Sequence, residues 1–368
     1  MHVDLPGPDE IERLLAHRGP ACVSIYLPTR PDTPDGEQER IGWKNLAADA
    51  LRLLRSRGVD DREAPRWRAL LDAVDSDARF WRYQARTLAA FTDGDAIRTF
   101  QLPNRLPELV TVTNRFHVKP LLRSVTFPQA CFVLALTQGS VRLWEIGADF
   151  GPFEVPVSDL PADADGFLRS APGGERSPMQ RITGDEGQKV RLAQFARAVD
   201  RSVREALRGV ELPVVLAATE PVAGIYRQIS GLPHLADEDI AGSPERMTGP
   251  ELAQAARAVL DRMYAAQLQE LRARFDDEAG RHRTATDLAD LARAATHGAV
   301  DVLLVDVDDV VTGTIDGRGG LHPGTGPETY DVIDEIARRV LQTRGRVLAV
   351  RADDVPGGGS AAAILRWA

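Results

Sequence analysis

Short apolar runs alternate with longer amphipathic stretches along this chain, and this alternation constrains the fold more than any other feature. The runs at residues 131–136, 214–218 and 300–305 are almost entirely apolar. Apolar runs of this length, bounded by turn residues, are typical of strands buried on both faces. Strands that are separated by helices build layered α/β structures. We therefore expect an α/β protein.

Amphipathic helices are predicted between the strands. Residues 189–207 place apolar side chains at helical spacing, which gives one continuous apolar face suited to packing on a core. The same spacing predicts helices at residues 41–57, 66–74, 250–276, 286–296 and 328–342. Two antiparallel hairpins are expected where strands follow each other across a short turn: residues 87–91 with 96–100, and residues 131–136 with 141–146.

Size and composition restrict the class of protein. The 368 residues correspond to two or three domains, at about 100–200 residues per domain. The net charge of −9 disfavours nucleic-acid binding by the chain as a whole, so any RNA contact must be local. Cys22 and Cys131 are too few for a disulfide framework or a four-cysteine zinc site, which indicates the cytoplasm. We expect no signal peptide and no membrane partner, because no apolar stretch approaches the ~18 residues that span a bilayer.

The usual cofactor and metal patterns are missing. Gly317, Gly319 and Gly320 resemble part of a phosphate-binding loop, but His322 stands where a further glycine would be needed. The histidines are scattered and no pair has the helical spacing of a zinc hydrolase, so His117 is interpreted as a local hydrogen-bonding group. We expect neither a metal nor a cofactor.

One stretch resembles the first motif of haloacid-dehalogenase-like phosphatases. It runs from Leu303 to Val310, and the resemblance implies Asp306 as nucleophile and Asp308 as acid/base. Only 62 residues follow Asp306, too few for the remaining motifs of that fold. We favour a buried strand that ends in solvated acids and keep the phosphatase as a minor alternative.

Separated stretches resemble the archaeo-eukaryotic peptide release factors and Pelota, and most closely their bacterial branch. Near the start, the Ser-x-Tyr-x-Pro pattern of residues 23–28 is followed by Trp43-Lys44-Asn45-Leu46. Near the end, residues 287–304 resemble the helix and Gly-Ala-Val strand of the third domain of that family. The tail, residues 359–367, is similar to the closing Ile-Leu-Arg segment of the family.

The resemblance also covers the middle of the chain. There a long polar loop ends in Glu186-Gly187-Gln188 and a helix follows, as the Gly-Gly-Gln loop precedes a basic helix in the family. By resemblance, Gln188 would orient water at the peptidyl-tRNA ester and Gly187 would permit the sharp turn. Glu186 stands in place of the first glycine and brings a carboxylate toward RNA phosphates. Whether the protein is a peptidyl-tRNA hydrolase is therefore left open.

The resemblance implies three α/β domains. The first spans residues 1–125. The second, residues 126–245, would be ribonuclease-H-like and carry the Glu186-Gly187-Gln188 loop. The third, residues 246–368, would be an α/β/α domain like the kink-turn-binding ribosomal proteins.

Basic residues gather around the middle loop and its helix. Residues 176–204 include seven basic and three acidic residues, whereas the whole chain has a net charge of −9. Such a concentration of Lys and Arg is what phosphate contacts require. The residues assigned to rRNA or tRNA binding are Arg176, Arg181, Lys189, Arg191, Arg197 and, from the first domain, Lys44.

These features predict a ribosome-associated factor that resembles release factors and Pelota and acts at the A site in ribosome rescue or hibernation. Glu186 favours the version without hydrolysis. The expected partners are the ribosome with its rRNA, tRNA and a translational GTPase, and neither DNA nor a membrane. The alternative of a different class is an RNA-binding stress-response module that does not enter the ribosome.

Overall fold

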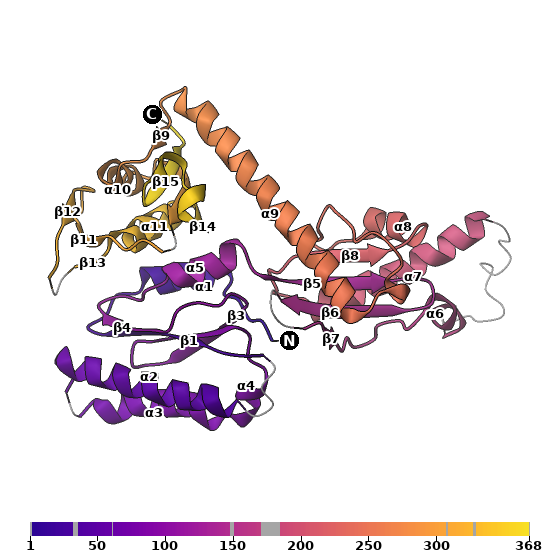
Figure 1. Cartoon of the computed structure of the whole chain (residues 1–368), viewed down its shortest axis with the longest axis horizontal. Coiled ribbons are helices and arrows are strands. Elements are labelled where there is room, and N and C mark those ends of the chain that lie inside the picture. The colour runs from indigo at the N-terminus through magenta and orange to yellow at the C-terminus, as the bar shows by residue number, and fades with distance from the viewer. Residues whose placement is uncertain are drawn as a thin grey trace. The chain divides into compact units, whose positions relative to one another are not determined.

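Helices and strands alternate along the whole chain, which confirms the predicted α/β class (Figure 1). The computed structural model describes residues 2–31, 36–60, 62–147, 151–170, 185–306, 308–326 and 329–367. Internal contacts divide the chain into two units. The larger unit joins His2–Pro128 to Ala265–Ala368, and the smaller unit is Gln129–Tyr264.

The N-terminal part of the larger unit is an antiparallel sheet with helices on both faces. Its strand order is β3-β2-β1-β4. The central strand β1 is buried on both faces: Val23 and Ile25 face α2 and α3, whereas Cys22 and Tyr26 face α1 and α5. The elements are α1 (Pro8–Ala16), β1 (Cys22–Pro28), α2 (Glu37–Ser56), α3 (Ala64–Ser76), α4 (Ala78–Arg82), β2 (Thr87–Thr92), β3 (Ile97–Leu102), β4 (Leu109–Thr113) and α5 (Lys119–Thr126).

The C-terminal part of the larger unit is a mixed sheet of order β14-β10-β15-β9, with a small second sheet of order β12-β11-β13. Strand β10 pairs parallel with β14 and antiparallel with β15. The elements are β9 (Thr284–Ala285), α10 (Leu288–Thr296), β10 (Val300–Asp306), β11 (Thr312–Ile315), β12 (Leu321–Pro323), β13 (Tyr330–Asp331), α11 (Val332–Gln342), β14 (Arg346–Val350) and β15 (Ala361–Leu365).

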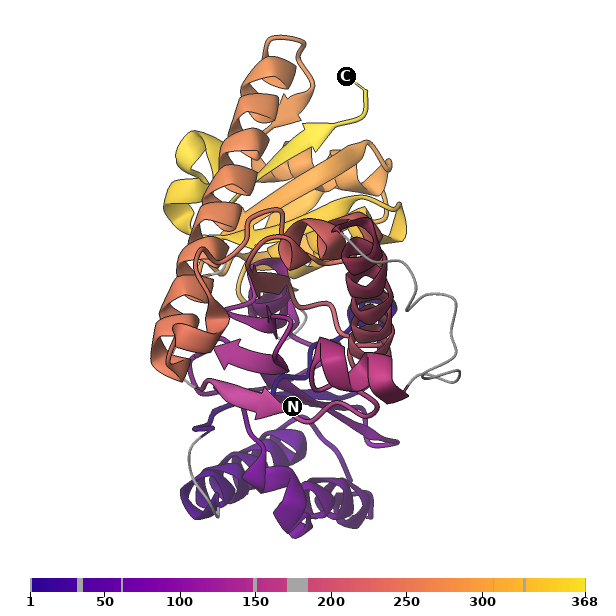
Figure 2. The ribbon, with the colours of Figure 1, turned by 90° about the vertical axis from the view of Figure 1, so that its right-hand side faces the viewer.

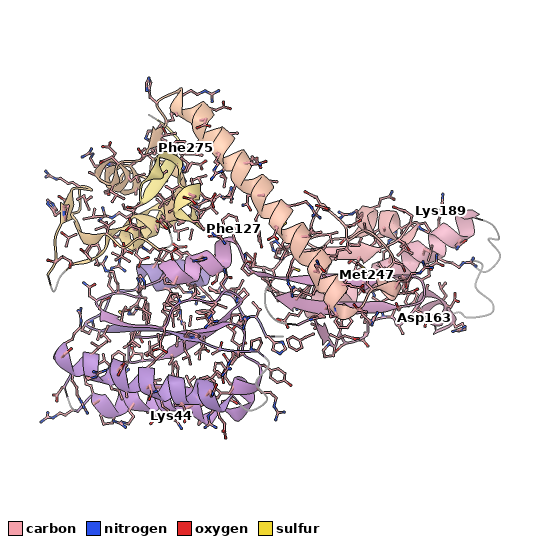
Figure 3. All side chains as sticks on the ribbon, in the orientation of Figure 1. Lys44, Phe127, Asp163, Lys189, Met247 and Phe275 are labelled. Carbon is pink, nitrogen blue, oxygen red and sulfur yellow. The ribbon has the colours of Figure 1, made fainter. Side chains whose placement is uncertain are left out.

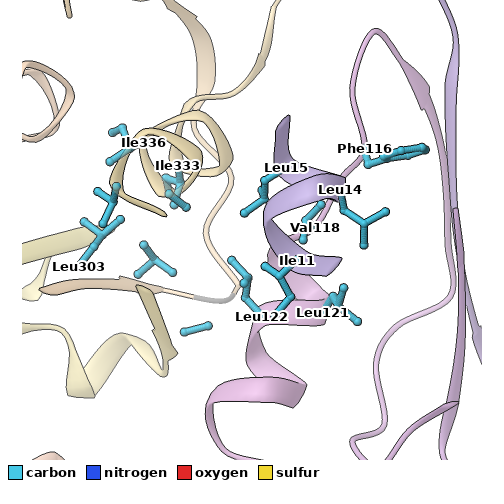
Figure 4. Close-up of a cluster of buried hydrophobic side chains, with 14 of the residues drawn as sticks. Ile11, Leu14, Leu15, Phe116, Val118, Leu121, Leu122, Leu303, Ile333 and Ile336 are labelled. Atoms are coloured by element: carbon cyan, nitrogen blue, oxygen red, sulfur yellow. The ribbon is translucent and has the colours of Figure 1, made fainter. Parts of the chain in front are cut away.

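The two parts of the larger unit share one hydrophobic core. Leu14 and Leu15 of α1 belong to the same buried cluster as Ile333 and Ile336 of α11, as the close-up in Figure 4 shows. Burial of such side chains contributes about 1.5–3 kcal/mol each. Segments that lie at opposite ends of the sequence are therefore held together by ordinary core packing. This packing fixes the start of α11 beside the segment that precedes α5.

The smaller unit is a four-stranded sheet covered on both faces, in the order β7-β6-β5-β8 (Figure 2). Strand β5 pairs antiparallel with β6 and parallel with β8. Cys131 and Val133 pack with Ala256 of α9 on one face of the sheet, while α7 and α8 cover the other face. The elements are β5 (Ala130–Leu136), β6 (Val141–Gly147), β7 (Phe153–Val155), α6 (Ala164–Ser170), α7 (Asp185–Ala206), β8 (Val214–Ala218), α8 (Val222–Ile229) and α9 (Gly249–Ala279).

Both predicted hairpins are confirmed. Strands β2 and β3 pair around Gly94, whose φ of +91° is the left-handed conformation that glycine adopts most readily in a turn. Strands β5 and β6 form the second hairpin. The predicted boundaries near residues 125 and 245 stay predictions. Helix α9 begins just beyond the second boundary and continues past Tyr264, where the smaller unit ends.

Candidate functional site

The site predicted around residue 188 lies at the start of α7. The sequence predicted a loop ending in Glu186-Gly187-Gln188 and a helix from Lys189, but the helix already begins at Asp185. The tripeptide is therefore helical in this structure. Acidic residues are favoured in the first turn of a helix because they complement its dipole, which accounts for the earlier start. A glycine costs about 1 kcal/mol in a helix interior but less near an end, so Gly187 does not prevent it.

The first turns of α7 present polar and apolar side chains to solvent. Gln188 and Lys189 are exposed, whereas Gly187 is buried. Lys189 lies on this end of the helix in Figure 3. Val190 beside it is 40% exposed. The helix start thus exposes an amide, an ammonium group and an apolar side chain, which lie on different sides of the helix.

A fixed scaffold supports this helix start. Phe195, Val199 and Val203 are fully buried and attach α7 to its sheet. Farther along, the buried carboxylate of Asp200 accepts hydrogen bonds from Ser230 Oγ at 3.0 Å and from the Gly231 backbone N–H at 3.1 Å. These bonds tie α7 to the end of α8. Asp200 is therefore occupied inside the protein, whereas Glu205 of the same helix is exposed.

The outer face of α7 is basic. Arg197, Arg201 and Arg204 follow each other at intervals of four and three residues, so they lie on one side of the helix, and all three are exposed. Arg204 lies 3.9 Å from Asp200, and Arg208 pairs with Glu205. A hollow of about 560 Å³ lies next to this face, lined by Arg201, Arg204, Arg208, Gly231 and His234 among others. We call Arg197, Arg201 and Arg204 the arginine face.

The remaining predicted RNA-binding residues are placed differently. Arg191 is half-buried on α7, away from the arginine face. Arg176 and Arg181 lie outside the described residues. Lys44 belongs to α2 in the larger unit, where its Nζ lies 3.3 Å from Asp75 Oδ2. The structure therefore places Lys189, Arg191 and Arg197 on one helix of the smaller unit, whereas Lys44 belongs to the larger unit.

A buried charged cluster in the larger unit was not found from the sequence. His117 Nδ1 lies 2.9 Å from Asp334 Oδ2, and Lys119 Nζ lies 2.8 Å from Asp331 Oδ2. Burial alone would lower the pKa of His117, but the charge and hydrogen bond of Asp334 outweigh burial and raise it. The interpretation of His117 as a local hydrogen-bonding group agrees with this contact.

The same cluster has the composition of a metal site. Ligand atoms of His117, Asp331 and Asp334 all lie within 4.8 Å of one another. The ammonium group of Lys119 already pairs with Asp331, however, and His117 with Asp334. A divalent ion would therefore face repulsion from Lys119. The arrangement fits paired charges better than a metal, and the expectation of no metal stays a prediction.

The aspartates of the phosphatase alternative lie at the end of β10. Asp306 is 9% exposed, and its Oδ1 accepts the backbone N–H of Asp308 at 3.0 Å. Asp308 points to solvent, 3.7 Å from Arg123 of α5. The first aspartate is thus engaged by its own loop. This geometry favours the interpretation as a strand ending in solvated acids.

The two cysteines are buried strand residues, as expected. Cys22 lies in β1 and Cys131 in β5, and both are free. Burial raises the pKa of Cys22 to about 11 and that of Cys131 to about 12. Thiols with such values are protonated near neutral pH, so neither is a nucleophile. Within the described part of the chain, no helix is long and apolar enough to cross a membrane.

Several solved structures are similar to this chain. A chain of the model of ribosome-bound archaeal Pelota and ABCE1 is 13% identical, with a TM-score of 0.41 over 99% of this chain and 95% of that one. Dom34 of S. cerevisiae, a translation termination-like factor, is 12% identical, with a TM-score of 0.41 over 76% and 79%. The archaeal translation termination factor aRF1 is 15% identical, with a TM-score of 0.25 over 99% of both chains. TM-scores this low place no residue of this chain on a residue of those proteins.

A family model identifies the part of the chain that carries α7. No curated protein matches the sequence. Residues 128–266, which correspond closely to the smaller unit, match the model of bacterial archaeo-eukaryotic release factor family 11. The resemblance seen in the sequence is thereby confirmed for this segment, which matches the family model.

Proposed function

We propose that this protein is a ribosome-associated translation factor that contacts RNA through the arginine face and the exposed start of α7. One observation carries the proposal: the segment that matches a release-factor family is the segment whose helix presents Gln188, Lys189 and three exposed arginines. The names of the similar structures agree with this class, since they describe a ribosome-bound Pelota and a termination factor.

The proposed interface is local, as the charge of the chain requires. The arginine face carries three positive charges on one side of α7, and Asp200 is turned inward and occupied. Phosphate contacts made by such a face release counterions, so binding must weaken steeply with salt.

We infer further that the protein occupies the ribosomal A site without hydrolysing peptidyl-tRNA, as a hibernation factor would. Two observations support this version. Gly187 and Gln188 are helical, whereas the hydrolytic loop of the family requires a sharp bend at its glycines. Glu186 also places a carboxylate where the family has glycine, which repels the phosphates around the ester.

A peptidyl-tRNA release assay separates the two versions. Stalled 70S ribosomes that carry labelled peptidyl-tRNA are incubated with the wild-type protein, with Gln188→Ala or with buffer. We expect the same background release in all three samples. Release by the wild type that Gln188→Ala abolishes would establish rescue by hydrolysis in place of hibernation.

Co-sedimentation tests the alternative from the other class. We expect the wild-type protein to pellet with 70S ribosomes at low salt. If the protein binds RNA oligonucleotides but stays in the supernatant when the ribosomes pellet, the protein is better described as an RNA-binding module that does not enter the ribosome. The proposed translational GTPase partner would then lose its support as well, whereas the proposed cytoplasmic location, which rests on the two cysteines, would not.

A further inference from the structure

An unusual concentration of positive charge surrounds one carboxylate in the larger unit. Glu335 of α11 is 4% exposed and accepts hydrogen bonds from four guanidinium groups. Its Oε2 lies 2.7 Å from Arg18 Nη2, 2.9 Å from Arg115 Nη1 and 3.0 Å from Arg338 Nε. Its Oε1 accepts from Arg338 Nη2 and, at 3.0 Å, from Arg339 Nε. The carboxylate is saturated, because its two oxygens offer about four acceptor positions.

The guanidinium groups are held in place by other contacts. Arg115 lies 3.5 Å above the ring of Tyr330 and donates to Asn114 through Nε. Arg18 Nη1 donates to the backbone oxygens of Leu15 and His17, each at 2.7 Å. A cluster held this firmly does not need to rearrange before it binds a ligand.

The charge of this cluster is not balanced. Four arginines face one glutamate, an excess of three positive charges. The nearest other acids already have partners. Asp331 pairs with Lys119, and Asp334 pairs with His117. Asp316 accepts hydrogen bonds from backbone N–H groups of its own turn and lies near His322. Asp93 lies 3.5 Å from His17. Among the described residues, the ion pairs of these four arginines all go to Glu335.

The electrostatic consequences appear on the cluster itself. Burial alone would raise the pKa of Glu335, but the hydrogen bonds and charges of Arg338, Arg339 and Arg115 lower it to about 2. Burial and the charge of Arg115 lower the pKa of Arg18, and Arg338 adds to this effect. An added anion would offset both the repulsion among the arginines and their desolvation.

Solvent reaches this cluster, and donors remain for a ligand. The side chains of Arg18, Arg338 and Arg115 are 34%, 18% and 13% exposed. Among the described residues, neither Arg18 Nε nor Arg115 Nη2 has a protein acceptor. Arg338 donates from Nε and Nη2 to Glu335 and from Nη1 to Gln342 Oε1 at 2.5 Å. The donors left for a ligand are therefore Arg18 Nε and Arg115 Nη2, and the positive charge of all the guanidinium groups adds to the attraction of an anion.

We propose that Arg18, Arg115 and Arg338 form a binding site for a phosphate group, supplied either by a small polyphosphate or by the backbone of RNA. Arginine suits this ligand because its planar fork donates two parallel hydrogen bonds to phosphate oxygens. Glu335 acts as the positioning residue that gathers the three guanidinium groups. The site lies in the larger unit and does not depend on the function proposed for α7.

Isothermal titration calorimetry of the full-length protein tests the proposal. Sodium pyrophosphate and a single-stranded RNA oligonucleotide are titrated in separate experiments, and sodium chloride of equal ionic strength is the control. We expect saturable binding of one or both probes. Arg18→Gln and Arg338→Gln should each weaken it at least tenfold. Arg13→Gln is the matched control, because it removes the same charge from the exposed face of α1 and should leave binding unchanged.

The pattern of binding identifies the source of the phosphate. Binding of pyrophosphate alone assigns the site to small anions. Binding of RNA that pyrophosphate displaces, with both lost in Arg338→Gln, assigns it to an RNA backbone. Binding of neither probe above the chloride control, or equal binding by wild type and both variants, would overturn the proposal.

A second measurement uses only the wild-type protein and therefore does not depend on how the variants fold. Arginines are modified with phenylglyoxal in the presence or absence of pyrophosphate, and the modified sites are identified by mass spectrometry. We expect pyrophosphate to slow modification of Arg18 several-fold and to leave Arg13 unaffected. Equal rates at Arg18 with and without the anion would also contradict the proposed site.

Discussion

At the scale of single residues, the charged contacts between the ends of the sequence determine the chemistry of the larger unit. Arg18 and Glu335 are 317 residues apart in the sequence, and Arg115 and Glu335 are 220 apart. No local pattern links such residues, so sequence reasoning could recognise neither this cluster nor the pairing of His117 with Asp334. It could predict buried thiols at Cys22 and Cys131, because burial of a strand residue follows from its immediate neighbours.

Glu335→Gln should destabilise the protein strongly. The substitution leaves four arginines around a neutral amide, and removal of one partner from a buried ion pair costs about 3–5 kcal/mol. Urea unfolding followed by circular dichroism measures the loss. Asp301→Asn is the control, because Asp301 pairs with Arg274 at the surface and should cost about 1 kcal/mol or less. Equal losses for the two variants would contradict the role given to Glu335.

The pair of His117 and Asp334 predicts a specific pH dependence. The pKa of His117 is raised in the folded protein, so the folded state binds this proton more tightly than the unfolded state does. The stabilisation that protonated His117 contributes is complete below pH about 6.5, the pKa of histidine in an unfolded chain. It is lost as the pH rises through the raised pKa of His117 in the folded protein.

Melting temperatures of the wild type and His117→Asn, measured from pH 5 to pH 9, test this dependence. We expect the difference between them to be largest at low pH and to shrink above about pH 6.5. His322→Asn is the control, because His322 is exposed near Asp316 and should shift the melting temperature little. A difference that grows with pH would have the wrong sign for this ion pair.

At the scale of elements, the strength of the periodic pattern decided what could be predicted. Strands β5, β8 and β10 and the body of α7 were predicted because five or more residues repeat one pattern. The two- and three-residue strands β9, β12 and β13 have no period to detect. The start of α7 was misplaced because a Gly-containing polar stretch resembles a loop, whereas the helix continues through Gly187.

The attachment of α7 to α8 gives a prediction for a whole element. Asp200→Ala should destabilise the protein by about 1–3 kcal/mol, because the Gly231 N–H and the Ser230 hydroxyl would lose their buried acceptor. Chemical denaturation measures the loss. Asp261→Ala on the exposed face of α9 should stay within about 0.5 kcal/mol of the wild type. A neutral Asp200→Ala would show that the buried carboxylate does not hold the helix.

At the scale of the whole molecule, a chain with a net charge of −9 carries a local positive face on α7 and a second excess of positive charge around Glu335. The average charge of the sequence therefore said little about where an anion can bind. The class of fold followed from alternating strands and helices. The resemblance to release factors followed from short motifs in the right order, and the family model matches residues 128–266.

Salt-dependent ribosome binding tests the central claim most directly. Three proteins are sedimented with 70S ribosomes over a series of salt concentrations: the wild type, the α7 variant Arg197→Gln/Arg201→Gln and the control Arg52→Gln/Arg57→Gln. The control removes two exposed charges from the larger unit. We expect the wild type and the control to bind alike. The α7 variant should bind more weakly, and the slope of its log affinity against log salt should be smaller by about 1–2. Equal affinities and slopes for all three proteins would contradict an RNA interface on α7.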